Sequence, residues 1–196
     1  MFRFRGRPVV STFGGQRCHF GSPTVNGGWR RVLKTNMTTE VHFIASFFMD
    51  PAIYGSIDAA DGAFSWDSAW PMGNYDISDE YDVEFRKYLP GRTYMAGVSP
   101  WFFTHYGPES FNKNFIFRAD NWLLASRWEI LVRNREHIDL VQVISWNDYG
   151  ESHYMGPIAG AQPNSTSWTT GFDHQGYQFS TTPPMYNFNA FVAASP

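Results

Sequence analysis

The stretch Val141–Pro157 reads VQVISWNDYGESHYMGP. It changes from apolar to polar residues along its length, and the rest of the chain is interpreted from this change. Its first four residues are apolar except for Gln142, which is typical of a buried β-strand. The sequence then becomes polar and aromatic, and Gly150 and Gly156 permit sharp bends of the backbone. The pattern predicts a strand that leaves a hydrophobic core and ends at a functional rim.

Two acidic residues, Asp148 and Glu151, follow this strand among aromatic side chains. Cleavage of a glycosidic bond needs one carboxylic acid to protonate the leaving oxygen and one carboxylate to activate water or attack the sugar. Three residues span at most ~10 Å, so the spacing allows both the short separation of retaining enzymes and the longer one of inverting enzymes. Neighbouring rings would stack on sugar faces and desolvate one carboxyl, which raises its pKa. The competing interpretation is a solvated turn.

Strand-like and helix-like segments alternate along the chain. Helices are predicted at 28–35, 79–89 and 121–134, the last with Asp120 or Asn121 as N-cap, and strands at 8–13, 41–48, 62–66, 93–98 and 141–146. This alternation predicts parallel βα units, and therefore an α/β protein that contains part of a (β/α)8 TIM barrel. Five strands do not close a barrel, and a complete one takes ~250 residues. We therefore expect a partial barrel, with active-site residues at the carboxyl ends of its strands.

Five segments strongly resemble fungal glycoside hydrolase family 71 and occur in the family's order: PVVSTFGG (8–15), GAFSWDSAWP (62–71), YMAGVSPWFFTHYG (94–107), RADNWLLASRW (118–128) and SWNDYGESHYMGP (145–157). Members are endo-acting α-1,3-glucanases, or mutanases, described as inverting. The resemblance implies that Asp148 and Glu151 are the catalytic pair, one as general acid and the other as general base, and we take Glu151 as the acid. It implies α-1,3-glucan as the substrate, and the sequence itself gives no evidence for a cofactor.

The resemblance also implies a domain organisation. Residues 1–160 match the last five βα units of the catalytic barrel, without its first strands, and residues 161–196 form an extension of the same domain that is either divergent or misassembled at its end. Adjacent prolines at 183 and 184 forbid a regular helix there. A second hypothesis is a truncated, inactive chain that retains only sugar-binding aromatics. A third is a hydrolase of the same barrel that acts on another glucan linkage.

Further substrate-binding candidates share a position after a predicted strand or beside the acidic pair. A histidine beside carboxyls can tune their protonation or bind a substrate hydroxyl. Asp50 also follows a strand, but Asp before Pro is typical of a turn. The candidates are Trp66, Asp67, Trp70, Trp101, His105, Tyr106, Trp146, Asn147, Tyr149, His153 and Tyr154.

Composition excludes several other classes of function. The net charge is −3 and no basic run occurs, which argues against nucleic acid as a partner and fits a neutral polysaccharide. No apolar run reaches 18 residues, so no membrane span is expected, and MFRFRGRPVV has no signal-peptide core, although the family is extracellular or located in the cell wall. Cys18 is the single cysteine and cannot form an internal disulfide. Neither a metal-ligand spacing nor a G-x-S-x-G serine elbow occurs.

Overall fold

The structure is a computed structural model that describes residues 1–73, 75–100, 102–106, 113–116, 122–148, 151 and 153–156; for 103–106 and 113–116 it describes the backbone. The chain divides into two compact units. Unit 1 comprises Met1–Ala69, Ile77–Val98 and Ser126–Val143, and unit 2 comprises Trp70–Asp76, Ser99–Ala125 and Ile144–Pro196. In the described part of the chain, no helix is both long and apolar enough to cross a membrane.

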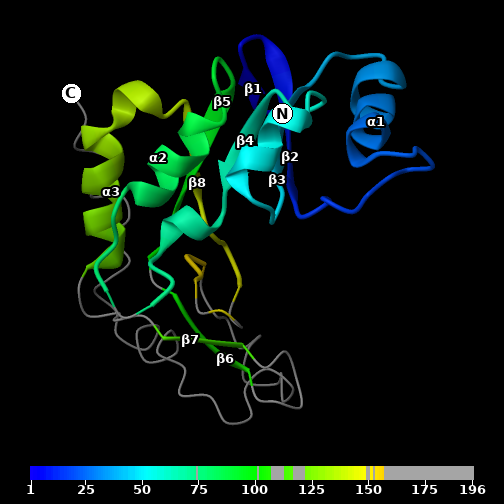
Figure 1. The fold of residues 1–196 in the computed structure, drawn as a ribbon. Helices are drawn as coiled ribbons and strands as arrows, with labels where there is room; N and C mark the ends of the chain where they lie inside the picture. Colours follow the sequence, from blue (N-terminus) through cyan, green and yellow to red (C-terminus); the bar gives the residue numbers. More distant parts are fainter. Residues whose placement is uncertain are drawn as a thin grey trace. The chain divides into compact units, whose positions relative to one another are not determined.

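Unit 1 is built on a six-stranded sheet in the order β1-β2-β3-β4-β5-β8 (Figure 1). The first pair is antiparallel, and every later pair is parallel. The predicted βα alternation with parallel pairing is therefore confirmed, and β1 is a strand that the sequence did not reveal. The bounds are β1 (Arg3–Phe4), β2 (Arg7–Phe13), β3 (His42–Ser46), β4 (Gly62–Ser65), β5 (Thr93–Val98) and β8 (Leu140–Val143).

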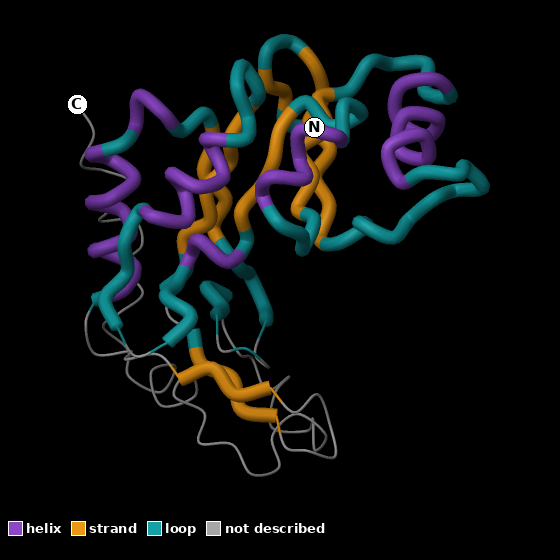
Figure 2. Tube along the Cα trace, viewed as in Figure 1, coloured by secondary structure: helices purple, strands orange, loops and turns teal. Residues whose placement is uncertain are grey.

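Helical segments lie in the connections between the parallel strands of the sheet (Figure 2). All three predicted helices form, with shifted ends; the first begins earlier than predicted because the Thr24 side chain caps it by accepting the Gly27 N–H. The predicted caps at 120 and 121 lie outside the described residues. The bounds are α1 (Val25–Arg30), η1 (Arg31–Thr35), η2 (Pro51–Ser56), η3 (Asp67–Ala69), α2 (Glu80–Lys87), α3 (Leu123–Arg133) and η4 (Arg135–His137).

Unit 2 contains a short antiparallel hairpin, β6 (Phe103–Tyr106) with β7 (Lys113–Ile116). The sequence interpretation assigned an aromatic loop to residues 101–106, and for 103–106 this is wrong. Aromatic and β-branched residues favour strands when a partner strand is available, and β7 supplies that partner. The hairpin was missed because the pairing segment has no clear period of its own.

The core of unit 1 lies around the three central strands. Every residue of β3, β4 and β5 is buried, which explains their nearly continuous apolar sequences. The outer strands β2 and β8 alternate between more and less exposed residues. Gly62 permits the close approach of β4 to β5, because a Cβ there would lie 2.3 Å from the Thr93 carbonyl oxygen. Any larger residue at this position would push the two strands apart.

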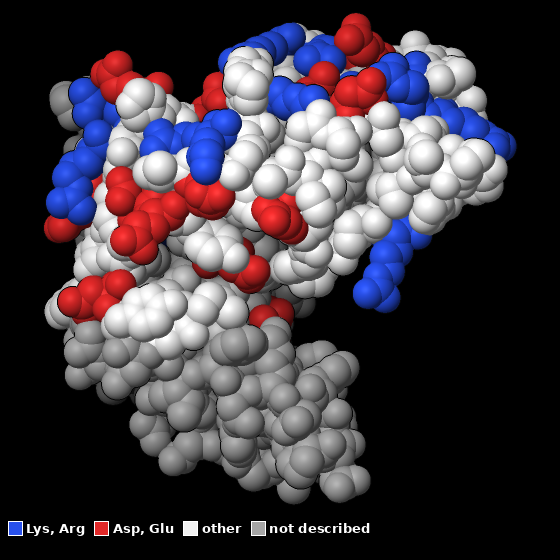
Figure 3. All heavy atoms as spheres, in the orientation of Figure 1, with Lys and Arg blue, Asp and Glu red and all other residues white. Residues whose placement is uncertain are grey.

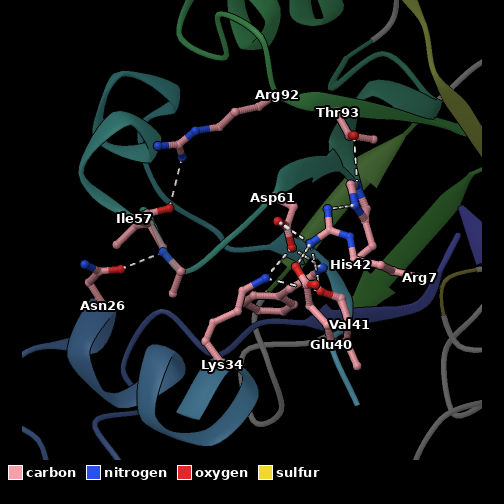
Figure 4. A network of polar contacts seen from close by, with 12 residues as sticks. Arg7, Asn26, Lys34, Glu40, Val41, His42, Ile57, Asp61, Arg92 and Thr93 are labelled. Carbon is pink, nitrogen blue, oxygen red and sulfur yellow. Dashed lines mark hydrogen bonds and ion pairs between the residues drawn. The ribbon is translucent and has the colours of Figure 1, made fainter. Parts of the chain in front are cut away.

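A polar network ties together the amino ends of the strands in unit 1 (Figure 4). Asp61 accepts hydrogen bonds from Lys34 Nζ (2.5 Å), the Phe43 backbone N–H (2.7 Å) and Arg7 (3.1 Å). Burial alone would raise the pKa of the Asp61 carboxyl, but the bonds from Lys34 and Phe43 outweigh it and hold the pKa below its usual range. Polar groups at this end of a barrel-type sheet serve stability rather than chemistry.

His42 belongs to the same network. Its Nδ1 accepts from Arg7 at 2.7 Å, so the ring proton sits on Nε2, which donates to Thr93 Oγ1 at 2.9 Å. Burial lowers the pKa of His42, and the attraction of Asp61 only partly opposes this. The imidazole is therefore held in its neutral form.

A second network in unit 1 is fully buried. Arg127 donates to both carboxylate oxygens of Asp82 (2.5 and 2.8 Å), to Ser68 Oγ (3.1 Å) and to the Gly97 carbonyl (2.9 Å). The side chains of Arg127 and Asp82 are both 0% exposed. The Tyr94 hydroxyl donates to Asp82 at 2.6 Å, and burial raises the pKa of this hydroxyl, so it remains a donor. One charged pair thus joins α3, α2, η3 and β5.

Candidate active site

The segment after β8 folds back on itself through Ser145. Its backbone N–H and its hydroxyl both donate to the His153 carbonyl, at 2.9 and 2.7 Å, while its Oγ accepts the Asp148 N–H at 2.9 Å. The Gly156 N–H bonds to the Trp146 carbonyl at 2.8 Å. A Cβ on Gly156 would lie 2.8 Å from both that oxygen and a Trp146 ring atom, so glycine is required. The described residues from Ser145 to His153 are therefore held in a closed turn.

This turn brings the two predicted catalytic carboxylates together. Asp148 Oδ1 accepts the backbone N–H of Glu151 at 3.0 Å. The other oxygen, Asp148 Oδ2, lies 3.4 Å from His153 Nε2, and Glu151 Oε2 lies 3.2 Å from the same nitrogen. One imidazole nitrogen thus lies between the two acids. The Asp148 side chain is 34% exposed and the Glu151 side chain 19%.

The separation of the two carboxylates is short in this structure. An oxygen of Asp148, an oxygen of Glu151 and a ring nitrogen of His153 all lie within 4.8 Å of one another. Retaining glycosidases place their carboxyl groups ~5–5.5 Å apart, and inverting enzymes ~6.5–9.5 Å apart. The sequence spacing had allowed both distances, and the observed geometry lies nearer to the shorter one.

Aromatic rings fix the orientation of His153. The imidazole is fully buried and packs nearly parallel to Trp70, with ring centroids 5.0 Å apart, and to Phe102, at 5.8 Å. Trp70 and Phe102 stack on each other at 4.2 Å with an interplanar angle of 4°. These three residues come from separate segments of unit 2. The ring plane, and with it the direction of Nε2, is therefore set by packing rather than by solvent.

Comparison with known proteins supplies the family. The family model for glycosyl hydrolase family 71 matches residues 1–196. The chain belongs to glycosyl hydrolase family 71. The resemblance drawn from the five sequence segments is thereby confirmed.

Curated relatives of the family 71 chain include two proteins of Schizosaccharomyces pombe and one of Penicillium rubens. The glucan endo-1,3-alpha-glucosidase of Schizosaccharomyces pombe is 35% identical over 188 residues, covering 92% of this chain and 42% of that protein. The mutanase of Penicillium rubens is 37% identical over 186 residues, covering 90% and 38%. The ascus wall endo-1,3-alpha-glucanase of Schizosaccharomyces pombe is 34% identical over 193 residues, covering 91% and 42%. The chain spans about two fifths of the length of these relatives.

Solved structures support the fold class of the family 71 chain. Two structures of the GH99 endo-alpha-mannosidase from Bacteroides thetaiotaomicron align with TM-scores of 0.57 and 0.55 over 80% of this chain and 49% and 46% of theirs. Their sequence identity to it is 10%, so the likeness concerns the fold alone. Together with the parallel sheet of unit 1, it agrees with a partial barrel.

The family 71 chain gathers three groups of the kinds that bind metal ions. Asp148, Glu151 and His153 each offer one ligand atom within 4.8 Å of the others. Linear spacing had predicted no metal site, because their separation of two and three residues is not that of a known motif. Carboxylate and imidazole donors suit zinc and similar ions, but the same three groups also suit acid–base chemistry. A chelator distinguishes the two uses.

The structure places the other predicted residues of unit 2 in different environments. Trp146 is 69% exposed and Asn147 is also exposed, so both are accessible beside the acids. Trp70 is 3% exposed and Tyr154 1%, so both are packed inside rather than presented on an open surface. Their sugar contacts remain predictions. Phe102, which the sequence analysis did not single out, proves to be a direct neighbour of His153.

Several predicted residues lie in other places. Trp101 and Tyr149 lie outside the described residues, as do the side chains of His105 and Tyr106 in β6. Trp66 and Asp67 follow β4 in unit 1, and both are partly exposed. Asp50 caps η2, because its Oδ1 accepts the Ala52 N–H at 2.9 Å. The turn interpretation of Asp50 is thereby confirmed.

Proposed function

We propose that the protein hydrolyses α-1,3-glucosidic bonds within α-1,3-glucan, and that this chain carries its two catalytic carboxyls. The observation that carries the proposal is the pair Asp148 and Glu151, held in one turn with His153 between them. Two carboxyls at this range are what glycoside cleavage requires. The substrate follows from the names of the relatives, and we assign the five parallel strands to a (β/α)8 barrel.

The two carboxyls have different surroundings, which suggests different roles. Glu151 is the less exposed side chain, at 19%, and reduced solvation favours a carboxyl that carries a proton. Asp148 is more exposed, at 34%, and its Oδ1 accepts the Glu151 backbone N–H, so it lies nearer to the solvent that supplies the attacking water. Glu151 therefore acts as the general acid that protonates the leaving oxygen, and Asp148 as the general base that activates water.

His153 supports this exchange of a proton. Its Nε2 faces both acids, so an N–H there donates to whichever carboxylate is ionised. When Glu151 has given up its proton, the new charge meets a donor that is already in place. The rings of Trp70 and Phe102 keep that donor from turning away. His153 is thus a positioning residue that acts through the two carboxyls.

The stereochemical course is a finer part of the proposal. The family resemblance implies inversion, in which Asp148 activates a water that needs room between the carboxyls. Retention is the second candidate, and the oxygen separation within 4.8 Å favours it. We propose inversion, with the two acids moving apart as sugar and water enter. Proton NMR of the first product decides: a newly formed β-anomeric end means inversion, and an α-anomeric end means retention.

The activity test is the release of reducing ends from insoluble α-1,3-glucan by the full protein. Asp148→Asn and Glu151→Gln are each expected to lower the rate at least ~100-fold, because each removes one acid–base function. Glu136→Gln serves as the matched control, because Glu136 is 76% exposed and lies outside the turn. If either catalytic variant keeps the rate of Glu136→Gln, the assignment of the pair is wrong.

Two further arms separate the rival interpretations. Incubation with a chelator is expected to leave the rate unchanged; a loss restored by added zinc would assign the three groups as ligands instead. Glucans with α-1,4 or β-1,3 linkages are expected to be poor substrates, and comparable rates on them would favour a different linkage. Binding of α-1,3-glucan without any cleavage would favour an inactive sugar-binding chain.

The surface charge and the relatives bear on the substrate and on where it is found. A neutral polymer fits the mixed charges on the face shown in Figure 3. The ascus wall relative suggests action at a cell wall.

A further inference from the structure

The loop between η1 and β3 carries the tripeptide Asn36-Met37-Thr38. Asparagine, followed by any residue except proline and then by serine or threonine, is the acceptor sequence for N-linked oligosaccharides. The chain contains this motif twice, and the second copy, at 164–166, lies outside the described residues. Such tripeptides also arise by chance, so the surroundings of Asn36 in the fold decide what the motif means.

The fold presents this motif to solvent. All five residues from 36 to 40 are exposed. Met37 is 43% exposed although its side chain is large and apolar, so the loop does not pack into the core of unit 1. An N-linked oligosaccharide is bulky and is tolerated at a protein surface. An exposed loop of this kind therefore accommodates it after the chain has folded.

The side chain of Asn36 has no structural task among the described residues, with which it makes no hydrogen bond. Asn26 is a contrasting case, because its amide donates to Asp58 at 2.5 Å and accepts the Ala59 N–H at 2.9 Å. A sugar on the Asn26 nitrogen would disturb these bonds. The nitrogen of Asn36 can carry one at no such cost.

Both ends of the loop are anchored by groups other than the Asn36 amide. At its start, the backbone N–H of Asn36 donates to the Arg31 carbonyl at 3.0 Å and closes η1. At its end, Arg7 donates to Glu40 Oε1 at 3.1 Å (Figure 4). A sugar on the side-chain nitrogen of Asn36 breaks neither bond, so the loop keeps its conformation.

The loop leads into the amino end of β3, where the polar network of Asp61 and His42 lies. In barrel-type folds this end serves stability, whereas active sites lie at the carboxyl ends of the strands. The chain leaves the carboxyl end of β8 to form the turn of Asp148 and Glu151. A group on Asn36 is therefore attached at the end of the sheet that the proposed chemistry does not use.

We propose that Asn36 is a site of N-linked glycosylation. The donor is an oligosaccharide joined through its anomeric carbon to a polyprenyl diphosphate, and a transferase of the secretory pathway catalyses the step. The bond from the anomeric carbon to the diphosphate oxygen breaks, and the diphosphate leaves with the bonding electrons. A new bond joins that carbon to Asn36 Nδ2, which loses one proton. The motif requires the hydroxyl of Thr38. Export of the chain rests on the proposed function at a cell wall; the acceptor rests on the loop.

The test maps the attachment site in secreted protein. The full protein is directed into the secretory pathway of a yeast by a secretion leader and is purified from the medium. Digestion with N-glycosidase in heavy-oxygen water converts each glycosylated asparagine to a labelled aspartate. Peptide mass spectrometry is expected to find the label at position 36. Its absence there would overturn the proposal, whether or not Asn164 is labelled.

Two adjacent threonines provide a matched pair of variants. Thr38→Ala and Thr39→Ala make the same change at neighbouring exposed positions, but only the first destroys the motif. Thr38→Ala is expected to lose all label at Asn36, whereas Thr39→Ala and Thr38→Ser are expected to keep it. Label that survives in Thr38→Ala, or that is lost to the same extent in Thr39→Ala, would overturn the assignment. Equal Tm values of the enzymatically deglycosylated variants exclude misfolding as the cause of a loss.

Failure of this site and failure of the proposed function give different results. Asn36→Gln is expected to migrate faster on a denaturing gel and to keep the wild-type rate of reducing-end release from α-1,3-glucan. Labelled Asn36 in a protein that does not cleave would overturn the proposed function alone. Unlabelled Asn36 in a secreted protein that cleaves would overturn the glycosylation site alone. A slower rate in Asn36→Gln would overturn the placement of the sugar away from the chemistry.

Discussion

The buried pair of Arg127 and Asp82 gives the sharpest quantitative prediction for unit 1. Substitution Arg127→Met removes four hydrogen bonds from a guanidinium that is 0% exposed and leaves the Asp82 carboxylate equally buried. Asp82 then keeps the bond from the Tyr94 hydroxyl. Removing one partner of a buried pair costs ~3–5 kcal/mol, because the remaining charge is no longer compensated. The free energy of unfolding should fall by this amount.

The expected change is large enough to measure by two methods. In a protein of this size, 1 kcal/mol corresponds to ~2–4 °C in Tm, so Arg127→Met should lower Tm by ~6–20 °C. Urea unfolding should show a lower midpoint with an unchanged slope. Arg135→Met is the control, because Arg135 and its partner Glu136 are 70% and 76% exposed and their atoms lie 3.8 Å apart. Such a pair contributes at most ~1 kcal/mol.

A double substitution tests the cause of the loss. In Arg127→Met with Asp82→Leu no charge is left buried, and replacing a buried pair by apolar residues is often close to neutral. The double variant should therefore be more stable than Arg127→Met alone. The reasoning is refuted if Arg127→Met loses no more stability than Arg135→Met, or if the double variant is less stable than the single one.

Three further predictions concern other positions. Tyr54→Phe should cost ~1–3 kcal/mol, measured by urea unfolding, because the buried Tyr54 hydroxyl accepts the Phe47 N–H at 2.6 Å and the substitution leaves that donor unsatisfied. Gly156→Ala should lower kcat on α-1,3-glucan without abolishing folding, because the new methyl group would displace Trp146 in the turn of the acids; wild-type kcat would contradict this. The pKa of His42 is lowered in the folded protein, so its contribution to stability is present above pH ~6.5 and is lost as the pH falls through the folded value. His42→Gln should therefore flatten the decline of the urea midpoint on going from pH 7 to pH 5, and an equally steep decline in both proteins would contradict the assignment.

The strands were predictable because burial on both faces leaves a strong local signal. The runs that became β3 and β5 are nearly all apolar, and the interior of a parallel sheet requires this. β1 has two residues and β6 depends on its partner β7, so neither has a pattern that local sequence reveals. The acidic pair was likewise visible because its members are only three positions apart in the sequence.

The surroundings of that pair were not predictable in the same way. Phe102 reaches His153 across about fifty residues of sequence, and Trp70 across about eighty, so only the folded chain shows that the rings form one stack. The aromatic character of Trp70 suggested a sugar contact, and the folded chain shows in addition that Trp70 and Phe102 are buried and pack around an imidazole. In the sequence, an aromatic residue that contacts a sugar looks the same as one that packs inside the protein. Only the neighbours that surround it in the folded chain distinguish the two.

The buried network of unit 1 also holds the short helical segment η3 in place. Ser68 is the neighbour of Asp67 in η3, and its hydroxyl accepts from Arg127 at 3.1 Å while donating to the Ser65 carbonyl at 2.8 Å. The position of η3 is therefore fixed in part by a buried cation. Ser68→Ala removes this tether without leaving a charge unpaired, because Arg127 keeps both bonds to Asp82. We expect Ser68→Ala to lower Tm by less than Arg127→Met does, and an equal loss of Tm would show that the Ser68 hydroxyl, rather than the compensation of charge, accounts for the effect of Arg127.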